Sequence, residues 1–265
     1  AILVGVVCAV VGTYIVLRGM AFFGDALAHT ILPGVAVGYL VSGGAKETLF
    51  WWALGTSVLS SLGISLISKN SRIKEDTAIG IVFAGMFALG IALISTVRSY
   101  AVDLSHFLFG DVLGVTSGNL WTIGIFTALV ILVIIAFYKE FLVLSFDPVL
   151  AVTLRLPVTF LKNLLLVLTA VVIVASLQAV GVTLVLAMLV TPAASAYLLT
   201  RRLPTMMMLG AGLGAAGAVV GLYLSYYANL ASGPAIVLTE TLVFVLVLLF
   251  GPRRGLIWRR KAPAA

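Results

Sequence analysis

Residues 22–41 read FFGDALAHTILPGVAVGYLV, an apolar run of the length that crosses the hydrocarbon core of a bilayer as one helix. Within this run, Asp25 and His29 are the side chains that can carry charge near neutral pH. A spacing of four residues places both on one face of a helix, so a carboxylate and an imidazole converge there. Because an ionisable group at bilayer depth costs at least about 2.5 kcal/mol, the pair predicts a functional site.

The donor atoms of Asp25 and His29 indicate what such a site would bind. Oxygen and nitrogen ligands together suit manganese, zinc or iron better than the all-oxygen shells that calcium and magnesium prefer. A single histidine on an apolar face is often a hydrogen-bonded core residue, but the acid one turn away favours the metal site.

The composition of the whole chain agrees with a membrane protein. Hydrophobic residues make up 62% of the 265 residues, charged residues make up 9%, and the mean hydropathy is +1.24. We therefore predict an all-α fold, a single polytopic transmembrane helix bundle over residues 1–265 with about nine spans (about 8–10). The apolar runs that we assign to spans are 1–17, 22–41, 48–67, 77–97, 119–138, 163–178, 182–199, 206–226 and 235–250.

The basic residues predict the orientation of these spans. If the first run reaches the cytoplasm at Arg18, 14 of the 16 lysines and arginines lie in cytoplasmic segments, and only Lys46 and Arg98 lie outside. This distribution follows the positive-inside rule. It also explains the net charge of +7 better than nucleic-acid binding does, because the basic residues form short clusters between apolar runs without interleaved aromatic residues.

Several other chemistries are excluded or disfavoured by the sequence. Cys8 is the single cysteine, so neither a disulfide nor a cysteine metal cluster can form within the chain. Residues 212–217, GLGAAG, match a dinucleotide-binding pattern, but they lie inside an apolar run where close helix packing explains them better. The chain contains no phosphate-binding loop, so we expect no ATP hydrolysis by this chain alone. Because residue 1 is an alanine followed at once by an apolar run, we expect that some N-terminal residues precede it.

Two loops are longer than a turn. In the outer loop, 98–118, the helical spacing of Leu104, Phe107, Leu108 and Asp111 predicts an interfacial helix. Asp103, His106 and Asp111 in this loop lie outside the bilayer, where a structural role is favoured. The inner loop, 139–162, contains a stretch at 147–157 with a proline near each end. We expect a single helix there, lying on the cytoplasmic side as a docking element.

Glu240 is a second candidate for a functional acid, because it lies within the last apolar run. It could contribute a further ligand to a metal site. It could equally pair with a hydroxyl or basic neighbour across the bundle, or line water near the outer surface. The sequence leaves these interpretations open.

Six stretches resemble, in order, the motifs of the permease subunits of bacterial zinc and manganese ABC importers, the ABC-3 type metal permeases. The resemblance extends from about residue 5 to about residue 245, and the stretches together are far more specific than any one alone. They are RGMAFFGDALAH (18–29), LPGVA (32–36), EDTAIGIVFA (75–84), DL with FLFG (103–104 and 107–110), VGV (180–182) and LVTPAA (189–194).

The resemblance implies a type II ABC importer-like permease in the bacterial plasma membrane, surrounded by lipid, with no enzymatic activity and no permanently bound cofactor. It implies a homodimer with a path at or near the subunit interface, an extracellular or periplasmic metal-binding protein, and a cytoplasmic ABC ATPase. The family's metal ligands correspond to Asp25 and His29, whereas Glu240 departs from the family pattern. The ATPase would bind around residues 147–157, and the coupling residues would be Pro148, Val152, Leu154, Arg155, Leu156 and Pro157.

The cargo predicted in this way is manganese or zinc, with iron as a further candidate. Other function classes stay open at this point. A proton- or ion-coupled secondary transporter or a channel would require an inverted repeat and discontinuous helices, and we find no convincing internal repeat. An ABC permease for metal chelates would require a wide path rather than ligands for a bare ion. A purely structural membrane subunit is disfavoured by the ordered polar residues.

Overall fold

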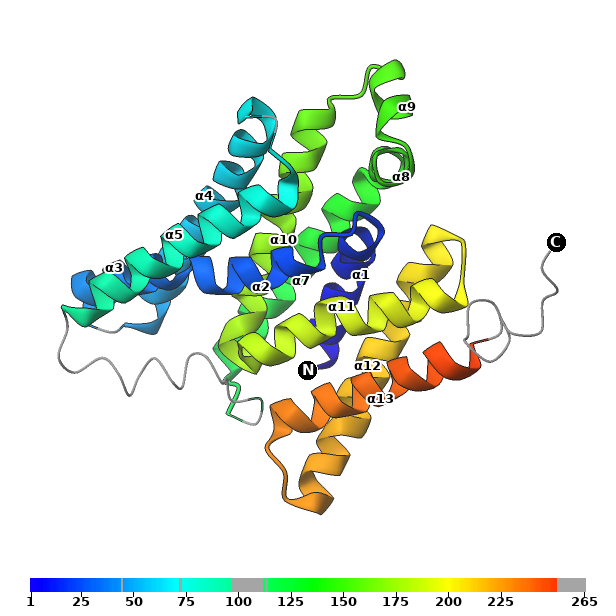
Figure 1. Ribbon diagram of the computed structural model, residues 1–265. Coiled ribbons are helices and arrows are strands. Elements are labelled where there is room, and N and C mark those ends of the chain that lie inside the picture. The colour runs from blue at the N-terminus through cyan, green and yellow to red at the C-terminus, as the bar shows by residue number, and fades with distance from the viewer. Residues whose placement is uncertain (44, 72, 97–111, 113, 252–265) are drawn as a thin grey trace.

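The computed structural model describes the chain except residues 44, 72, 97–111, 113 and 252–265, and the described part is helical without a strand (Figure 1). The prediction of an all-α fold is therefore confirmed. The helices are α1 (Ile2–Leu17), α2 (Ala21–Thr30), α3 (Leu32–Ser42), α4 (Lys46–Ser71), α5 (Glu75–Ser95), α7 (Ser117–Ala136), α8 (Tyr138–Phe146), α9 (Pro148–Thr153), α10 (Val158–Val180), α11 (Val182–Leu199), α12 (Leu203–Ala228) and α13 (Ser232–Phe250).

The number and position of the spans agree with the hydrophobic pattern. Among the described residues, eight helical segments are long and apolar enough to cross a membrane, and α1 is a shorter apolar helix. Together, these eight segments and α1 correspond to the nine predicted spans. The run predicted at 182–199 coincides with α11, whereas α10 begins at Val158, five residues before the run predicted at 163. The charged Lys162 comes directly before residue 163, so the predicted apolar run begins after it, although the helix itself starts earlier.

α1 lies at the centre of the bundle and approaches its neighbours through glycines. A Cβ atom added to Gly5 would lie 2.8 Å from the carbonyl oxygen of Gly214 on α12, and one added to Gly12 would overlap the carbonyl of Leu189 on α11. Between helices in lipid, small residues of this kind permit backbone contact where no hydrophobic driving force exists. The interpretation of residues 212–217 as a packing element is therefore confirmed.

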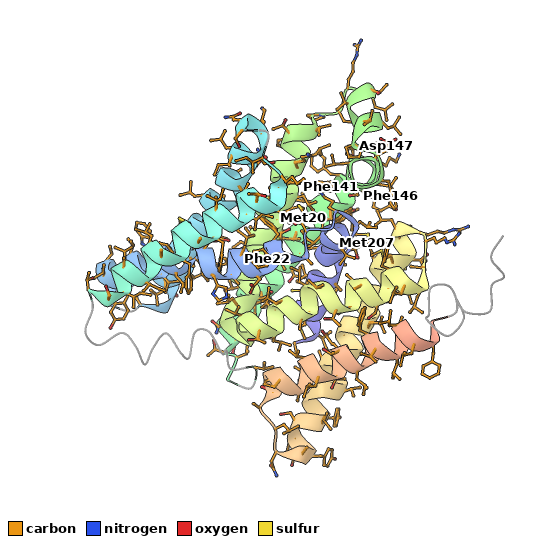
Figure 2. All side chains as sticks on the ribbon, in the orientation of Figure 1. Met20, Phe22, Phe141, Phe146, Asp147 and Met207 are labelled. Carbon is orange, nitrogen blue, oxygen red and sulfur yellow. The ribbon has the colours of Figure 1, made fainter. Side chains whose placement is uncertain are left out.

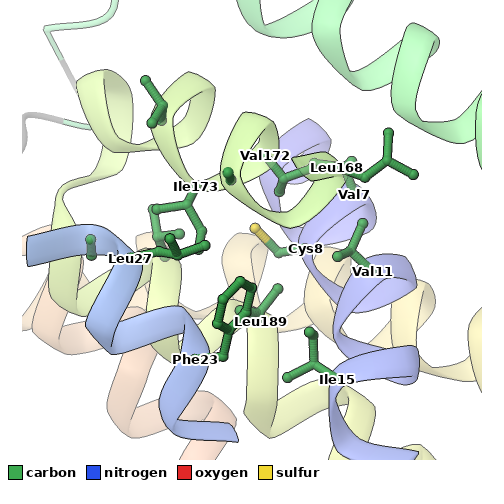
Figure 3. Packing of buried hydrophobic residues seen from close by; sticks show 14 of the residues in the cluster. Val7, Cys8, Val11, Ile15, Phe23, Leu27, Leu168, Val172, Ile173 and Leu189 are labelled. Carbon is green, nitrogen blue, oxygen red and sulfur yellow. The ribbon is translucent and has the colours of Figure 1, made fainter. Parts of the chain in front are cut away.

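The other face of α1 meets α2 and α10. Figure 3 shows Cys8, Val11 and Ile15 of α1 among buried side chains that include Phe23 of α2 and Ile173 of α10. α2 touches the central helix and packs mainly against α5, with further contacts to α10, α4 and α11. This arrangement positions the face of α2 that carries the candidate site.

α2 and α3 form one span that is broken at Ile31. Pro33 lies in the first turn of α3 and has no N–H group, so it cannot donate the helical hydrogen bond to the carbonyl of His29. α5 runs parallel to this broken span and packs closely at the break. A Cβ atom added to Gly90 would lie 2.6 Å from Leu32 Cβ and 3.1 Å from the backbone nitrogen of Pro33.

The cytoplasmic loop contains more helix than we predicted, and the expected docking helix is shorter. α8 occupies the start of the loop, and α9 ends at Thr153 rather than near residue 157. Asp147 caps α9 by accepting hydrogen bonds from the backbone N–H groups of Val149 and Leu150, at 3.0 and 2.9 Å. Arg155 then adopts a left-handed conformation, with φ of 56°, which turns the chain away before Pro157. Figure 2 shows Asp147 beside Phe146 at the junction of α8 and α9.

The interfacial helix predicted in the outer loop falls largely on residues outside the described part of the chain. Asp103, His106 and Asp111 all belong to that segment. Their predicted structural role stays a prediction.

The close approach of α1 to α11 generates a test of the fold. Gly12→Ala places a methyl group against the Leu189 carbonyl and should destabilise the protein by about 1–3 kcal/mol, the usual cost of overpacking a core. Gly63→Ala is the matched control, because Gly63 lies in helix α4 with open space around it. Thermal unfolding in detergent should show a lower midpoint for Gly12→Ala only. Equal midpoints for the two variants would contradict the packing described for α1.

Candidate functional site

Asp25 and His29 lie side by side on α2, as their spacing predicts. The Nε2 atom of His29 is 3.6 Å from the Oδ1 atom of Asp25. This separation is longer than a hydrogen bond, so both donor atoms are available to one ligand. The side chains are 27% and 39% exposed, respectively, on the surface of this single chain. The pair therefore forms an open, two-ligand site.

The site lies at the end of a helix segment. His29 is in the last turn of α2, and the break at Ile31 follows two residues later. Helix breaks occur at the ion sites of many transporters. In a continuous helix every backbone carbonyl accepts a hydrogen bond, whereas at a break some carbonyls become free to contact an ion. The sequence signal for this break is Pro33 within an apolar run.

Two phenyl rings from α5 pack on the imidazole of His29. The ring centroids of Phe83 and Phe87 are 5.9 and 5.6 Å from that of His29, with interplanar angles of 65° and 86°. Phe22 of α2 extends this aromatic cluster through a contact with Phe83 at 5.9 Å. Sequence reasoning missed the two α5 rings, although their spacing of four residues on one helix face was a readable signal.

An ion pair fixes the cytoplasmic end of the same two helices. Arg18, just before α2, donates from Nη2 to both carboxylate oxygens of Glu75 at the start of α5, each at 3.2 Å. The arginine side chain is 9% exposed, so this pair is largely removed from water. Charge-assisted bonds of this kind are stronger than neutral hydrogen bonds. The pair therefore holds the start of α5 against the entry to α2.

Glu240 occupies a different part of the bundle. It lies on α13, is 3% exposed, and packs against Gly217 of α12, where an added Cβ atom would lie 2.7 Å from Glu240 Cγ. Neither of its carboxylate oxygens has a hydrogen-bond partner among the described residues. Within that same part of the chain, no three His, Cys, Asp or Glu side chains come close enough together to hold a metal ion. The fold therefore does not bring Glu240 to Asp25 and His29.

The cytoplasmic docking element presents apolar side chains to solvent. Val149, Val152 and Leu154 are 76%, 64% and 55% exposed. Beside them is an open groove of about 720 Å³, whose lining is Val152, Arg155, Leu156, Pro157, Val158, Thr159, Phe160 and Asn163. Four of the six predicted coupling residues line this groove. Pro148 begins α9, and Leu154 follows its last residue.

Nearly the whole chain is similar to known membrane transport proteins. Residues 1–251 match the model of the ABC 3 transport family. The chain is 50% identical over 258 residues to "Manganese transport system membrane protein MntC" of Listeria innocua, covering 97% of this chain and 90% of that protein. It is 44% identical to "Manganese import system permease protein ScaB" of Streptococcus gordonii, covering 98% and 92%. Among solved structures, PsaBC from Streptococcus pneumoniae in complex with Fab matches with a TM-score of 0.84 and 40% identity, covering 98% of this chain and 92% of that chain.

Proposed function

The chain belongs to the ABC 3 transport family and is the multi-pass membrane subunit of an ATP-driven metal importer, and from this premise we propose that its cargo is manganese(II), held in transit by Asp25 and His29. The chain itself is not an enzyme, because ATP hydrolysis in ABC importers belongs to a separate chain. The observation that carries the proposal is the convergence of a carboxylate oxygen and an imidazole nitrogen on one exposed face of a membrane helix.

Manganese is the proposed cargo because the relatives described above are named for manganese, and because the donor set suits it. Carboxylate oxygen is a preferred ligand of manganese, and imidazole accommodates all the first-row candidates. Manganese also binds most weakly of the divalent ions in the Irving–Williams order. Zinc and iron would bind the same two donors more tightly, so they stay the alternative cargoes.

Exposure of the pair supports a path at the surface of the chain. A carboxylate that is 39% exposed at this depth cannot face hydrocarbon without a large cost in free energy. Its face must therefore meet water or protein. We propose that a second copy of this chain covers this face, and that the ion path lies at or near the interface of the homodimer.

An incomplete ligand set suits transport. Two protein ligands leave most of the coordination positions of a divalent ion to water, or to the equivalent pair of the second subunit. A closed set of four protein ligands would hold the ion as a structural site does. An open set replaces part of the hydration shell and still permits release on the other side.

The partners proposed here are those that membership of an ABC importer family implies. A cytoplasmic ABC ATPase would dock on the apolar surface of α9 and the adjoining groove. Closure of the two ATPases would move α9 and alternate the side from which the ion site is accessible. An extracellular or periplasmic metal-binding protein would deliver the ion to the outer mouth.

Removal of either proposed ligand should abolish transport. Asp25→Ala and His29→Ala should each lower ATP-dependent manganese uptake by at least about tenfold, because one donor cannot replace the hydration of the ion. Uptake is measured in vesicles that contain the chain, its ATPase and its binding protein. Glu47→Ala is the control, since Glu47 is an exposed acid in the first turn of α4. Normal uptake by both site variants, with the complex intact, would remove the proposed site.

A charge on the docking surface should uncouple the ATPase from the path. Leu154→Glu puts a carboxylate on an apolar surface that we expect to be buried against the ATPase, and Leu156→Glu does the same in the groove. Both variants should lose uptake and lose the dependence of ATP hydrolysis on the metal-loaded binding protein. Asn70→Glu, at the exposed cytoplasmic end of α4, serves as the matched control. Unchanged coupling in the two leucine variants would place the docking site elsewhere.

Glu240 stays a proposed third residue of the ion path, acting at a position separate from Asp25 and His29. Its support is its burial with no hydrogen-bond partner in the part of the chain that the structure describes, which is costly for a carboxylate unless a proton or a cation offsets its charge. Glu240→Gln keeps the shape of the side chain and removes the negative charge. We expect manganese uptake to fall in this variant while assembly with the ATPase is retained. Wild-type uptake kinetics would assign Glu240 to packing alone.

A further inference from the structure

The aromatic contacts of His29 point to an additional role for α5. We propose that Phe83 and Phe87 are positioning residues that orient the His29 imidazole for the ion by ring packing, in place of a hydrogen-bonded partner. This inference rests on the proposed function of Asp25 and His29 as the ion pair. Neither phenylalanine has an atom that could bind the ion. Their part in ion binding is to hold the imidazole of His29 in place.

The first argument is the absence of a polar partner on the second ring nitrogen. A histidine that binds a metal ordinarily donates its other ring N–H to a carboxylate or a carbonyl, which fixes the ring and raises its basicity. In His29 the Nε2 atom is the one that faces Asp25. The Nδ1 atom is buried and has no hydrogen-bond partner in the described part of the chain. Among the described residues, the contacts that can orient this side of the ring are therefore packing contacts.

The second argument is the geometry of that packing. Phe83 and Phe87 lie one helical turn apart on α5, and their own rings stack at 5.7 Å with an interplanar angle of 23°. The imidazole stands nearly perpendicular to both, at 65° and 86°. Aromatic rings favour such edge-to-face contacts at centroid distances of about 4.5–7 Å. Two contacts of this kind restrict rotation of the imidazole about its χ2 torsion.

The third argument is that α5 is itself held in register with α2. Its first residue, Glu75, is paired with Arg18 on the cytoplasmic side of the site. On the outer side, Gly90 packs directly on Leu32 and Pro33. Both rings lie between these two points, and Phe87 is about 18 Å along the helix axis from Glu75 at 1.5 Å per residue. The rings are therefore fixed relative to the imidazole they contact.

Ring packing has a chemical consequence that a hydrogen bond would not have. It orients Nε2 toward Asp25 without the hydrogen-bonded acceptor at Nδ1 that strengthens metal binding by a supported histidine. The ion is then bound with defined geometry but less tightly than in a site with a carboxylate-supported histidine. This combination favours a site that must release its cargo in every cycle.

The test uses the complete importer with manganese as the probe. Phe83→Leu and Phe87→Leu remove a ring and keep an apolar side chain, and Phe87→Tyr keeps the ring. Phe126→Leu is the matched control, because Phe126 is also a half-buried phenylalanine on a membrane helix, but its ring contacts are with Phe50 and Trp51. Pulsed electron paramagnetic resonance of bound manganese reports whether an imidazole nitrogen is coupled to the ion.

We expect the leucine variants to lose the nitrogen coupling and to raise the KM for manganese uptake by about tenfold or more, with metal-independent ATP hydrolysis unchanged. Phe87→Tyr and Phe126→Leu should retain both properties of the wild type. If a leucine variant does not assemble, Phe87→Met, which fills the same space without a ring, should show the same losses. Wild-type coupling and KM in the leucine or methionine variants would overturn the positioning role.

The failure of this inference is distinguishable from that of the proposed function. If the wild type shows a nitrogen coupling that His29→Ala removes, the ion pair stands, and only the role of the two rings is under test. If the wild type shows no such coupling and His29→Ala transports normally, the ion site and the positioning role are both wrong.

Discussion

The cost of an ionisable side chain in hydrocarbon is the constraint on which this structure depends. A membrane helix can carry such a group only where protein, water or an ion offsets its charge. Two pairs of side chains meet this condition, whereas a third buried acid has no such partner among the described residues. Arg18 and Glu75 neutralise each other at the cytoplasmic end of α5. Asp25 and His29 share an exposed face that a divalent ion would stabilise. Glu240 is enclosed among helices without a polar partner in the described part of the chain.

Close packing between glycines supplies the rigid frame for these groups. α1 approaches the backbones of α11 and α12 through Gly5 and Gly12. α2 lies between this central group and α5, so the face with Asp25 and His29 is fixed on one side by packing and open on another. Pro33 separates α2 from α3 just beyond the site. Packing thus holds α2, the first half of the broken span, in place. The open face with Asp25 and His29 is left for a second subunit or for water to cover.

A transport site differs from a structural metal site in how much of the coordination shell the protein provides. In the site that we propose, one chain offers two donors, and two phenyl rings rather than a carboxylate contact the imidazole and would orient it. Both features lower affinity while they preserve geometry. They agree with the family membership of the chain and with a cycle in which ATP, rather than tight binding, supplies the direction of movement.

The sequence by itself determined the all-α membrane fold, the positions of the spans and the placement of Asp25 beside His29, because hydropathy and helical spacing are local properties. Only the tertiary structure decided that Phe83 and Phe87 pack on His29, that Arg18 pairs with Glu75, that Glu240 lies apart, and that α9 ends at Thr153. The physical reason is that side chains facing lipid and side chains facing another helix are equally apolar. Local spacing therefore cannot reveal which helix a given face will meet, and contacts between distant segments appear only when the bundle is assembled.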